Sequence, residues 1–331
     1  MVASSEPVPV VTLTGFLGSG KSTLVNALLG HERMPPTAVI VNELGEIPID
    51  HALIESVTEG IALLRSGCIC CAVRSDLEYT LRDLYLRRIR GALPDFRTVL
   101  LETTGMADPG PILQTLSSQP VREQRYTIGT VVTTVDCIHI GESLARHAEA
   151  ARQIAVADRL VLTKSDLSAE QAVAAVEDHL QSLNPVAARV RIIKGRATPE
   201  QVLGEQIAHE PALPAATPWA DTRSHEPHSG TVNAYCYRIP HALDWEELSN
   251  GLKALLDAHG DKVLRIKGIL QISGIEQPVV LQGVHHSMYP PELLSSWSRV
   301  GHGGRLVVIV DRLERSVVDE AVRSCTLPRR R

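Results

Sequence analysis

The residues from Gly15 to Ser22, GFLGSGKS, have the types and spacing that bind the phosphates of a nucleotide. They match G-x-x-x-x-G-K-[ST], and they lie between an apolar run and a stretch of helical character, as this motif requires. Glycines let backbone N–H groups surround phosphate oxygens, and the helix N-terminus adds a favourable dipole. We expect Lys21 to contact the β- and γ-phosphates and the Ser22 hydroxyl to bind Mg²⁺. The nucleotide-binding residues predicted in this loop are Gly15, Gly18, Ser19, Gly20, Lys21, Ser22 and Thr23.

A carboxylate follows a second apolar run, Thr98 to Leu101, and is itself followed by Thr103-Thr104-Gly105. This carboxylate is Glu102. At the carboxyl end of a strand it would hold Mg²⁺ through water, while the Gly105 N–H could sense the γ-phosphate. We therefore predict that Lys21 and Glu102 catalyse hydrolysis of the bound nucleotide.

The sequence Thr163-Lys164-Ser165-Asp166 follows the apolar run Leu160 to Leu162 and resembles the [NT]-K-x-D arrangement of guanine-specific proteins. A carboxylate can accept hydrogen bonds from both N1–H and the 2-amino group of guanine, whereas adenine does not offer this pair of donors. Thr163, Lys164 and Asp166 are therefore predicted to bind the base. The pattern favours GTP over ATP.

Three thiols crowd into Gly67-Cys68-Ile69-Cys70-Cys71, although the chain has only 6 cysteines. Thiolates are soft ligands that suit Zn²⁺, Cu(I) and, with nitrogen or carboxylate help, Co²⁺. In a pure strand Cys68 and Cys70 would share one face, so convergence of all three thiols needs a turn, which Gly67 helps to permit. Three ligands leave a fourth position open, as in sites that exchange their metal.

Other candidate ligands are less specific. Glu43 and Glu46 follow the second strand at the same edge as the phosphate loop and could reach either metal, or they could be solvated loop acids. His225 with His228, and His285 with His286, could each bind metal. Alternatively, the first pair could simply be exposed to solvent in a linker. The second pair could lie on opposite faces of a strand, where the two rings could not share a metal.

Apolar, β-branched runs alternate with helical patterns through the first two hundred residues, which predicts a doubly wound, mostly parallel sheet covered on both faces. The expected strands are 8–14, 37–41, 98–101, 129–135, 159–162 and 190–193, with helices at 22–29, 76–90 and 169–183. Proline and histidine without apolar periodicity at 210–230 indicate a linker. After it, strands at 231–239, 262–269, 279–285 and 305–310, with helices at 245–258 and from about 313, predict a small α+β domain. The predicted domains are therefore 1–209 and 231–331.

Composition excludes several classes of protein. Hydrophobic residues make up 44% and charged residues 21% of the chain, which is typical of globular proteins rather than disordered ones. The formal net charge of −5 argues against a general nucleic-acid or anionic-membrane surface. The absence of a long apolar run or a signal-like N-terminus favours the cytoplasm.

The segments GFLGSGKST, VNELGEIPID, GCICC, ETTGMADPGP and TKSD, in this order, resemble the CobW-type, YjiA-like metal-binding GTPases, which are relatives of UreG and HypB. DKVLRIKGIL and VVLQGV extend the resemblance through the second domain. It implies a P-loop NTPase fold with a CobW-type C-terminal domain, and a cytoplasmic GTPase that delivers Zn²⁺ or a similar metal such as Co²⁺ to a client metalloprotein. It also implies that Cys68, Cys70 and Cys71 form the metal motif, with Glu46 as an accessory ligand. Thr163 departs from the Asn of many relatives.

Three functions stay open on the sequence alone. They are a GTP-hydrolysing metallochaperone, a passive metal buffer or adaptor whose nucleotide site is only structural, and a P-loop kinase of small molecules. A kinase needs an acceptor pocket with a base and usually prefers ATP, which this sequence does not indicate. The expected ligands are GTP or GDP with Mg²⁺ and Zn²⁺, and a homo-oligomer that depends on nucleotide or metal is an open expectation.

Overall fold

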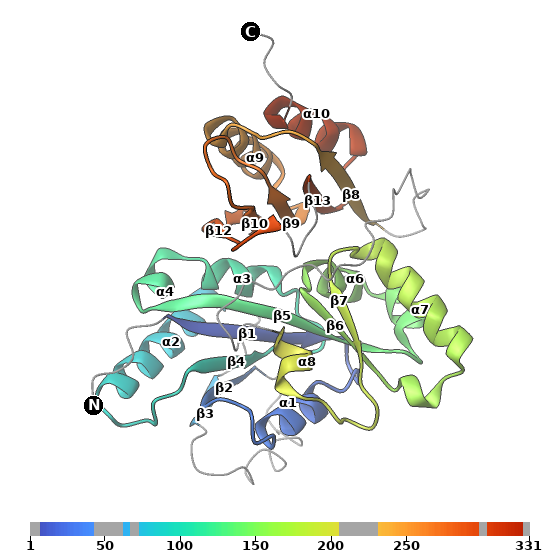
Figure 1. Ribbon diagram of the computed structural model, residues 1–331. Helices are drawn as coiled ribbons and strands as arrows, with labels where there is room; N and C mark the ends of the chain where they lie inside the picture. Colours follow the sequence, from blue (N-terminus) through green and yellow to red (C-terminus); the bar gives the residue numbers. More distant parts are fainter. Residues whose placement is uncertain (1–6, 43–61, 67–72, 205–230, 298–302, 327–331) are drawn as a thin grey trace. The chain divides into compact units, whose positions relative to one another are not determined.

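The structure is a computed structural model of the chain, and it describes residues 7–42, 62–66, 73–204, 231–297 and 303–326 (Figure 1). The amino-terminal elements are β1 (Val8–Gly15), α1 (Lys21–Leu29), β2 (Thr37–Asn42), β3 (Ala62–Ser66), α2 (Val73–Ile89), β4 (Thr98–Glu102), α3 (Gly110–Leu116), α4 (Gln119–Glu123), β5 (Tyr126–Asp136), α5 (Ile140–Arg146), α6 (Ala148–Val156), β6 (Arg159–Thr163), the 3-10 helix η2 (Ser165–Leu167), α7 (Glu170–Leu183), β7 (Ala188–Arg191) and α8 (Pro199–Leu203). The later elements are β8 (Val232–Ile239), α9 (Trp245–His259), β9 (Val263–Leu270), β10 (Val279–Val284), β11 (Ser287–Met288), β12 (Glu292–Leu293), β13 (Gly304–Asp311) and α10 (Arg315–Thr326).

The described residues form two compact units. The first contains β1 to β7 and most of the helices between and after them. The second contains β8 to β13 with α9 and α10, and His179–Val186 is grouped with it.

Seven strands form the sheet of the first unit in the order β3-β2-β4-β1-β5-β6-β7, and all neighbours are parallel. Because parallel strands end at the same edge, the carboxyl ends of β1, β4, β5 and β6 lie together. Figure 1 shows α1 and α8 on one side of this sheet and α3 and α6 on the other. The sheet is therefore doubly wound, which confirms the predicted mostly parallel sheet covered on both faces.

Continuous apolar sequence explains the central strands. Every residue of β4 is buried, as expected for a strand covered on both faces. One hydrophobic cluster joins side chains of β1, β2, β4, β5 and β6 to α1 and α8, including Leu13, Leu28, Leu100 and Val202. This core fixes the start of α1, and with it the phosphate loop, against the carboxyl edge of the sheet.

The second unit is an antiparallel sheet in the order β11-β10-β9-β13-β8, with β12 paired to β10. Leu248, Leu252, Leu255 and Leu256 recur at helical spacing on α9 and are buried in one core with sheet residues and with Val318 of α10. Asp244 caps α9 by accepting a hydrogen bond from the Glu247 N–H at 3.0 Å. The predicted α+β C-terminal domain is confirmed.

Some elements were not predicted. The sequence pattern predicts no strand at β3, β11 or β12 and no helix at α3 to α6 or α8. It also placed His285 and His286 on a strand, which is wrong: β10 ends at Val284, and His285 has a φ of 49° in the following turn. The His285 ring then contacts the Gly260 carbonyl, and the His286 ring contacts Asp261 at 2.9 Å. These contacts explain the pair as part of the local packing of the turn.

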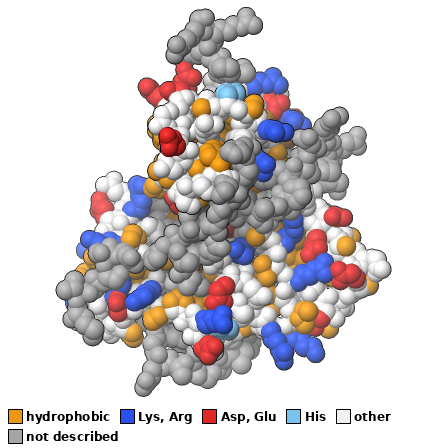
Figure 2. Space-filling model, viewed as in Figure 1, with side chains coloured by type: hydrophobic (Ala, Val, Ile, Leu, Met, Phe, Trp, Pro, Cys, Tyr) orange, Lys and Arg blue, Asp and Glu red, His pale blue; other side chains and the backbone are white. Residues whose placement is uncertain are grey.

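On the face drawn in Figure 2, basic and acidic side chains of the described residues are interspersed rather than gathered into one extended patch. This distribution agrees with the small net charge of −5. Among the described helices, none is long and apolar enough to cross a membrane.

Candidate nucleotide-binding site

The phosphate loop connects β1 to α1 through three glycines with positive φ. The angles are 143° at Gly15, 70° at Gly18 and 92° at Gly20, a region that L side chains rarely adopt. A side chain at Gly15 would also collide with Thr134 of the neighbouring strand β5. Glycine is therefore required by both the turn and the close packing. The local sequence accounts for an open cradle of backbone N–H groups at the start of α1.

Lys21 folds back over this cradle. Its ammonium donates hydrogen bonds to the carbonyls of Gly15 at 2.8 Å and Phe16 at 3.2 Å. Burial lowers the pKa of Lys21 below its ordinary value, and the nearby Glu102 carboxylate partly offsets this effect. A phosphate in the cradle would supply further negative charge and favour the charged ammonium. The Lys21 ammonium therefore lies where it could bind a phosphate held by the loop.

The strand-end acid lies beside the first turn of α1. Parallel pairing of β1 with β4 puts Glu102 next to Leu13, and the Ser22 hydroxyl donates a hydrogen bond to Glu102 Oε1 at 3.2 Å. Glu102 is only 6% exposed. A hydroxyl and a carboxylate are hard oxygen donors of the kind that Mg²⁺ prefers, so these two residues fit the ion predicted from the sequence.

The segment after β4 packs directly on the phosphate loop. A side chain at Gly105 would clash with Leu17, whose Cα would lie 2.9 Å from the added Cβ. Thr103 Oγ1 donates to Thr14 Oγ1 at 2.9 Å, and the buried Gln153 amide donates to the carbonyls of Gly105 and Ala107. Gly105 is thus held against the phosphate loop from two sides.

The TKSD segment contacts the same loop from β6. Thr163 Oγ1 donates to the Ser19 carbonyl at 2.9 Å, and Lys164 Nζ donates to the Gly18 carbonyl at 2.9 Å. Asp166 lies on η2, two residues beyond Lys164. The structure therefore brings the predicted phosphate and Mg²⁺ residues around one loop together with Thr163 and Lys164 of the predicted base-binding segment. Thr163, which stands where many relatives have Asn, contacts the loop through its hydroxyl.

Sequence reasoning missed two contributors from β5. Thr134 shares a 2.7 Å hydrogen bond with the Ser19 hydroxyl, and Asp136 accepts a 2.7 Å hydrogen bond from Lys164 Nζ. Asp136 ends the run VVTTVD just as Glu102 ends VLLE. The acid at a strand end was therefore a signal that could have found Asp136.

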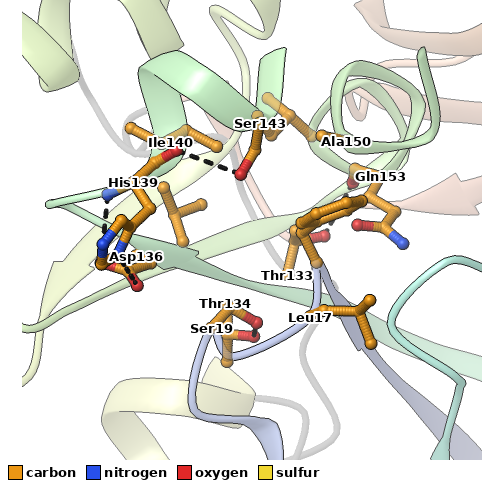
Figure 3. A pocket seen from close by; sticks show the side chains of 13 residues that line it. Leu17, Ser19, Thr133, Thr134, Asp136, His139, Ile140, Ser143, Ala150 and Gln153 are labelled. Atoms are coloured by element: carbon orange, nitrogen blue, oxygen red, sulfur yellow. Dashed lines mark hydrogen bonds and ion pairs between the residues drawn. The ribbon is translucent and has the colours of Figure 1, made fainter. Parts of the chain in front are cut away.

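A pocket borders the loop (Figure 3). It is lined by residues of the loop, the end of β5 and the helices α5 and α6, among them Phe16, Ser19, Thr134, His139 and Gln153. Asp136 and His139 lie together at one end of the pocket in Figure 3, and Gln153 lies at the other. The loop is thus framed by polar side chains on its β5 side.

The predicted transition-metal ligands Cys68, Cys70, Cys71 and Glu46 lie outside the described residues, as do Glu43, His225 and His228. Within the part of the chain that the structure describes, no group of three or more His, Cys, Asp or Glu side chains could hold a metal ion. The metal site therefore stays a prediction from the sequence.

Comparison with known proteins agrees with the observed fold. Residues 9–191 match the CobW/HypB/UreG nucleotide-binding domain, and residues 232–326 match the cobalamin synthesis protein CobW C-terminal domain. The chain belongs to the CobW/HypB/UreG family of P-loop GTPases. The family resemblance inferred from the sequence is thereby confirmed.

Two relatives and one solved structure show how far this similarity extends in the family. The chain is 34% identical to the zinc chaperone YjiA of Escherichia coli over 84% of this chain and 86% of that protein. It is 27% identical to the zinc chaperone CobW of Pseudomonas aeruginosa over 96% and 91% of the two chains. A crystal structure of Zn(II)-bound YjiA GTPase from E. coli matches with a TM-score of 0.73 at 27% identity, over 97% of this chain and 99% of that one.

Proposed function

We propose that the protein is a GTP-hydrolysing metallochaperone that binds Zn²⁺ and delivers it to a client metalloprotein. One observation supports the GTP-binding and GTP-hydrolysing part of this proposal. Lys21, the Ser22–Glu102 pair and the TKSD segment all meet at the phosphate loop. A cytoplasmic location is part of this proposal.

In this proposal each residue has a defined role in hydrolysis. The loop N–H groups and Lys21 bind the β- and γ-phosphates, while Gly105 contacts the terminal phosphate and Asp166 accepts hydrogen bonds from guanine. Ser22, and Glu102 through water, would hold Mg²⁺, which supplies neutralisation of the charge that develops on the phosphates. Lys21→Ala should lower turnover by at least about 100-fold, since one such electrostatic contact is typically worth that much.

The zinc half is supported by the sequence and by the relatives. Cys68, Cys70 and Cys71 would supply thiolates, with Glu46 as an accessory ligand. The similar proteins from E. coli and P. aeruginosa are named zinc chaperones. A triple mutant of YjiA, with one glutamate and two cysteines replaced by alanine, is also Zn(II)-bound, so bound zinc alone does not identify the ligands. The decisive experiment must measure affinity.

A chaperone, unlike a buffer, needs coupling between its metal and nucleotide sites. In the GTP state we expect residues 41–71, which join the end of β2 to the thiols, to bring Cys68, Cys70 and Cys71 toward one point, and hydrolysis would release them. Couplings of about 1–3 kcal/mol are typical, so GTP should tighten Zn²⁺ binding roughly 5- to 150-fold.

The test is a Zn²⁺ titration of the full chain with a non-hydrolysable GTP analogue, with GDP and without nucleotide. A variant with all three cysteines replaced by serine should lose tight zinc binding and keep its metal-free nucleotide affinity. Equal zinc affinity in all three nucleotide states would replace the chaperone proposal with the passive buffer. A preference for ATP over GTP would favour the kinase instead.

A further inference from the structure

Asp136, at the carboxyl end of β5, is a buried acid with several donors around it. It is 7% exposed, and its Oδ2 accepts from Lys164 Nζ at 2.7 Å and contacts His139 Nδ1 at 2.9 Å. Its Oδ1 accepts from the Ile138 N–H at 2.9 Å. Burial by itself raises the pKa of this carboxyl, but the hydrogen bonds from Lys164, His139 and Ile138 outweigh it, so the pKa lies below the ordinary 3.8. Asp136 is therefore ionised at neutral pH.

Lys164 is the link between this acid and the phosphate loop. Its ammonium contacts Asp136 on β5 and the Gly18 carbonyl in the loop at the same time. Its backbone has a φ of 57°, an uncommon conformation for a side-chain-bearing residue that the surrounding contacts must hold in place. Asp166 follows two residues later, so the placement of the predicted base-binding acid depends on the backbone at Lys164.

We propose that Asp136 is a positioning residue for guanine-nucleotide binding, which holds Lys164 so that the base-binding segment and the phosphate loop keep a fixed spacing. The carboxylate neutralises the ammonium and fixes its direction, and it does so without contacting the nucleotide. Loss of the carboxylate would free Lys164 and the TKSD turn. Because both GTP and GDP carry the base and the β-phosphate, binding of both should weaken to a similar extent.

His139 contacts the same oxygen of Asp136 as Lys164 does, but it holds the carboxylate more weakly. Its side chain is 62% exposed, so water can replace the bond that it makes to Asp136. Lys164 is 35% exposed and has a second fixed partner in Gly18. We therefore expect His139→Gln to have a smaller effect than Asp136→Asn.

The experiment measures GDP and GTP-analogue affinity for wild type, Asp136→Asn, Lys164→Met and the double variant, together with KM and kcat for GTP. Asp136→Asn should weaken both nucleotides about 10-fold, as expected for loss of one charge-assisted contact. KM should rise with kcat at saturation nearly unchanged. Because Asp136 acts through Lys164, the double variant should bind no more weakly than Lys164→Met alone.

Asp158→Asn is the matched control. Asp158 is equally buried and accepts a hydrogen bond from the Val131 N–H, but it lies just before β6, at the opposite edge of the sheet. This variant should lose stability and keep wild-type nucleotide affinity.

Three results would overturn the proposal: wild-type affinity in Asp136→Asn, wild-type affinity in Lys164→Met, or effects of the two changes that multiply. If Asp136→Asn does not fold, the nucleotide affinity of Lys164→Met, which keeps the apolar stem of the side chain, tests the proposal. The proposal rests on the nucleotide site proposed above, and a wild-type protein that fails to bind GDP would refute that site instead.

Discussion

The Ser22 hydroxyl donates a hydrogen bond to the Glu102 carboxylate at 3.2 Å, although the two residues are 80 positions apart in the chain. Parallel pairing of β1 with β4 produces this contact, since it aligns the end of each strand at the same edge of the sheet. This pair lies where we propose that Mg²⁺ binds next to the phosphate loop.

Glu102→Gln should raise the Mg²⁺ concentration needed for half-maximal GTP hydrolysis by about 10- to 100-fold, the usual cost of losing a partner that orients the ligands of a metal ion. The amide keeps the size of the side chain and removes its charge. Mg²⁺ titrations of the hydrolysis rate measure the shift. Glu177→Gln, which weakens the two hydrogen bonds that Glu177 accepts from Arg191, is the control and should behave as wild type. An unchanged Mg²⁺ requirement in Glu102→Gln would remove Glu102 from the metal site.

Gly105→Ala should weaken the GTP analogue about 10-fold more than it weakens GDP. The added methyl would meet the Leu17 backbone and push the ETTG segment away from the phosphate loop, where its N–H is expected to contact the γ-phosphate alone. The two affinities are compared by equilibrium titration. Gly141→Ala is the matched control, because no atom lies within 4 Å of the added Cβ. Equal losses for GTP analogue and GDP would show that Gly105 does not distinguish the terminal phosphate.

Asp166→Asn should lose GTP affinity and shift preference toward xanthosine triphosphate. The carboxylate offers two acceptors to the N1–H and 2-amino groups of guanine, whereas the amide offers one acceptor and one donor, which suits the carbonyl of xanthine. Competition of the two triphosphates against a labelled guanine nucleotide measures the change. Unaltered GTP binding in this variant would rule out base recognition by Asp166.

A site residue could be predicted from the sequence when its signal lies within a few neighbouring residues, and not when it depends on contacts between distant segments. The glycines of the phosphate loop, the acid of VLLE and the TKSD turn are local patterns, so they could be found. The hydrogen bond of Thr163 to the Ser19 carbonyl spans 144 positions and depends on strand order, which no local pattern contains. Asp136 combines both cases: its place at a strand end was visible in the sequence, whereas its pairing with Lys164 was not.

The fold was predictable to a similar degree. Long β-branched runs such as Val8–Gly15 are distinctive, whereas Ala62–Ser66, with the sequence ALLRS, has the composition of a helix and becomes β3 by pairing with β2. The short helices α3 to α6 and α8 lack enough turns to show a clear apolar period. Whether β3 and these short helices form depends on tertiary contacts rather than on the local sequence.

Stability should depend on pH through Asp136 on the acidic side. Its pKa is lower in the folded protein than the ordinary 3.8, so the folded state binds this proton less readily than the unfolded state. Its contribution is therefore complete above about pH 4 and is lost as the pH falls through the lower, folded-state value. Urea unfolding from pH 7 to pH 3 should show a stability difference between wild type and Asp136→Asn that shrinks below about pH 4. A difference that is constant with pH would contradict this linkage.

Zinc should protect Cys68, Cys70 and Cys71 from alkylation, and it should do so at lower zinc concentration when a GTP analogue is present. Thiolates that bind a metal cannot attack an alkylating reagent, so protection reports occupancy at each cysteine. The chain supplies its own controls: Cys137 and Cys325 are buried, and burial raises the pKa of each thiol to about 11. At pH 8 these two should stay unlabelled with or without zinc, and become labelled only on unfolding. Peptide mass spectrometry of the folded protein measures all positions together, and labelling of the three clustered cysteines that zinc does not change would show that they are not its ligands.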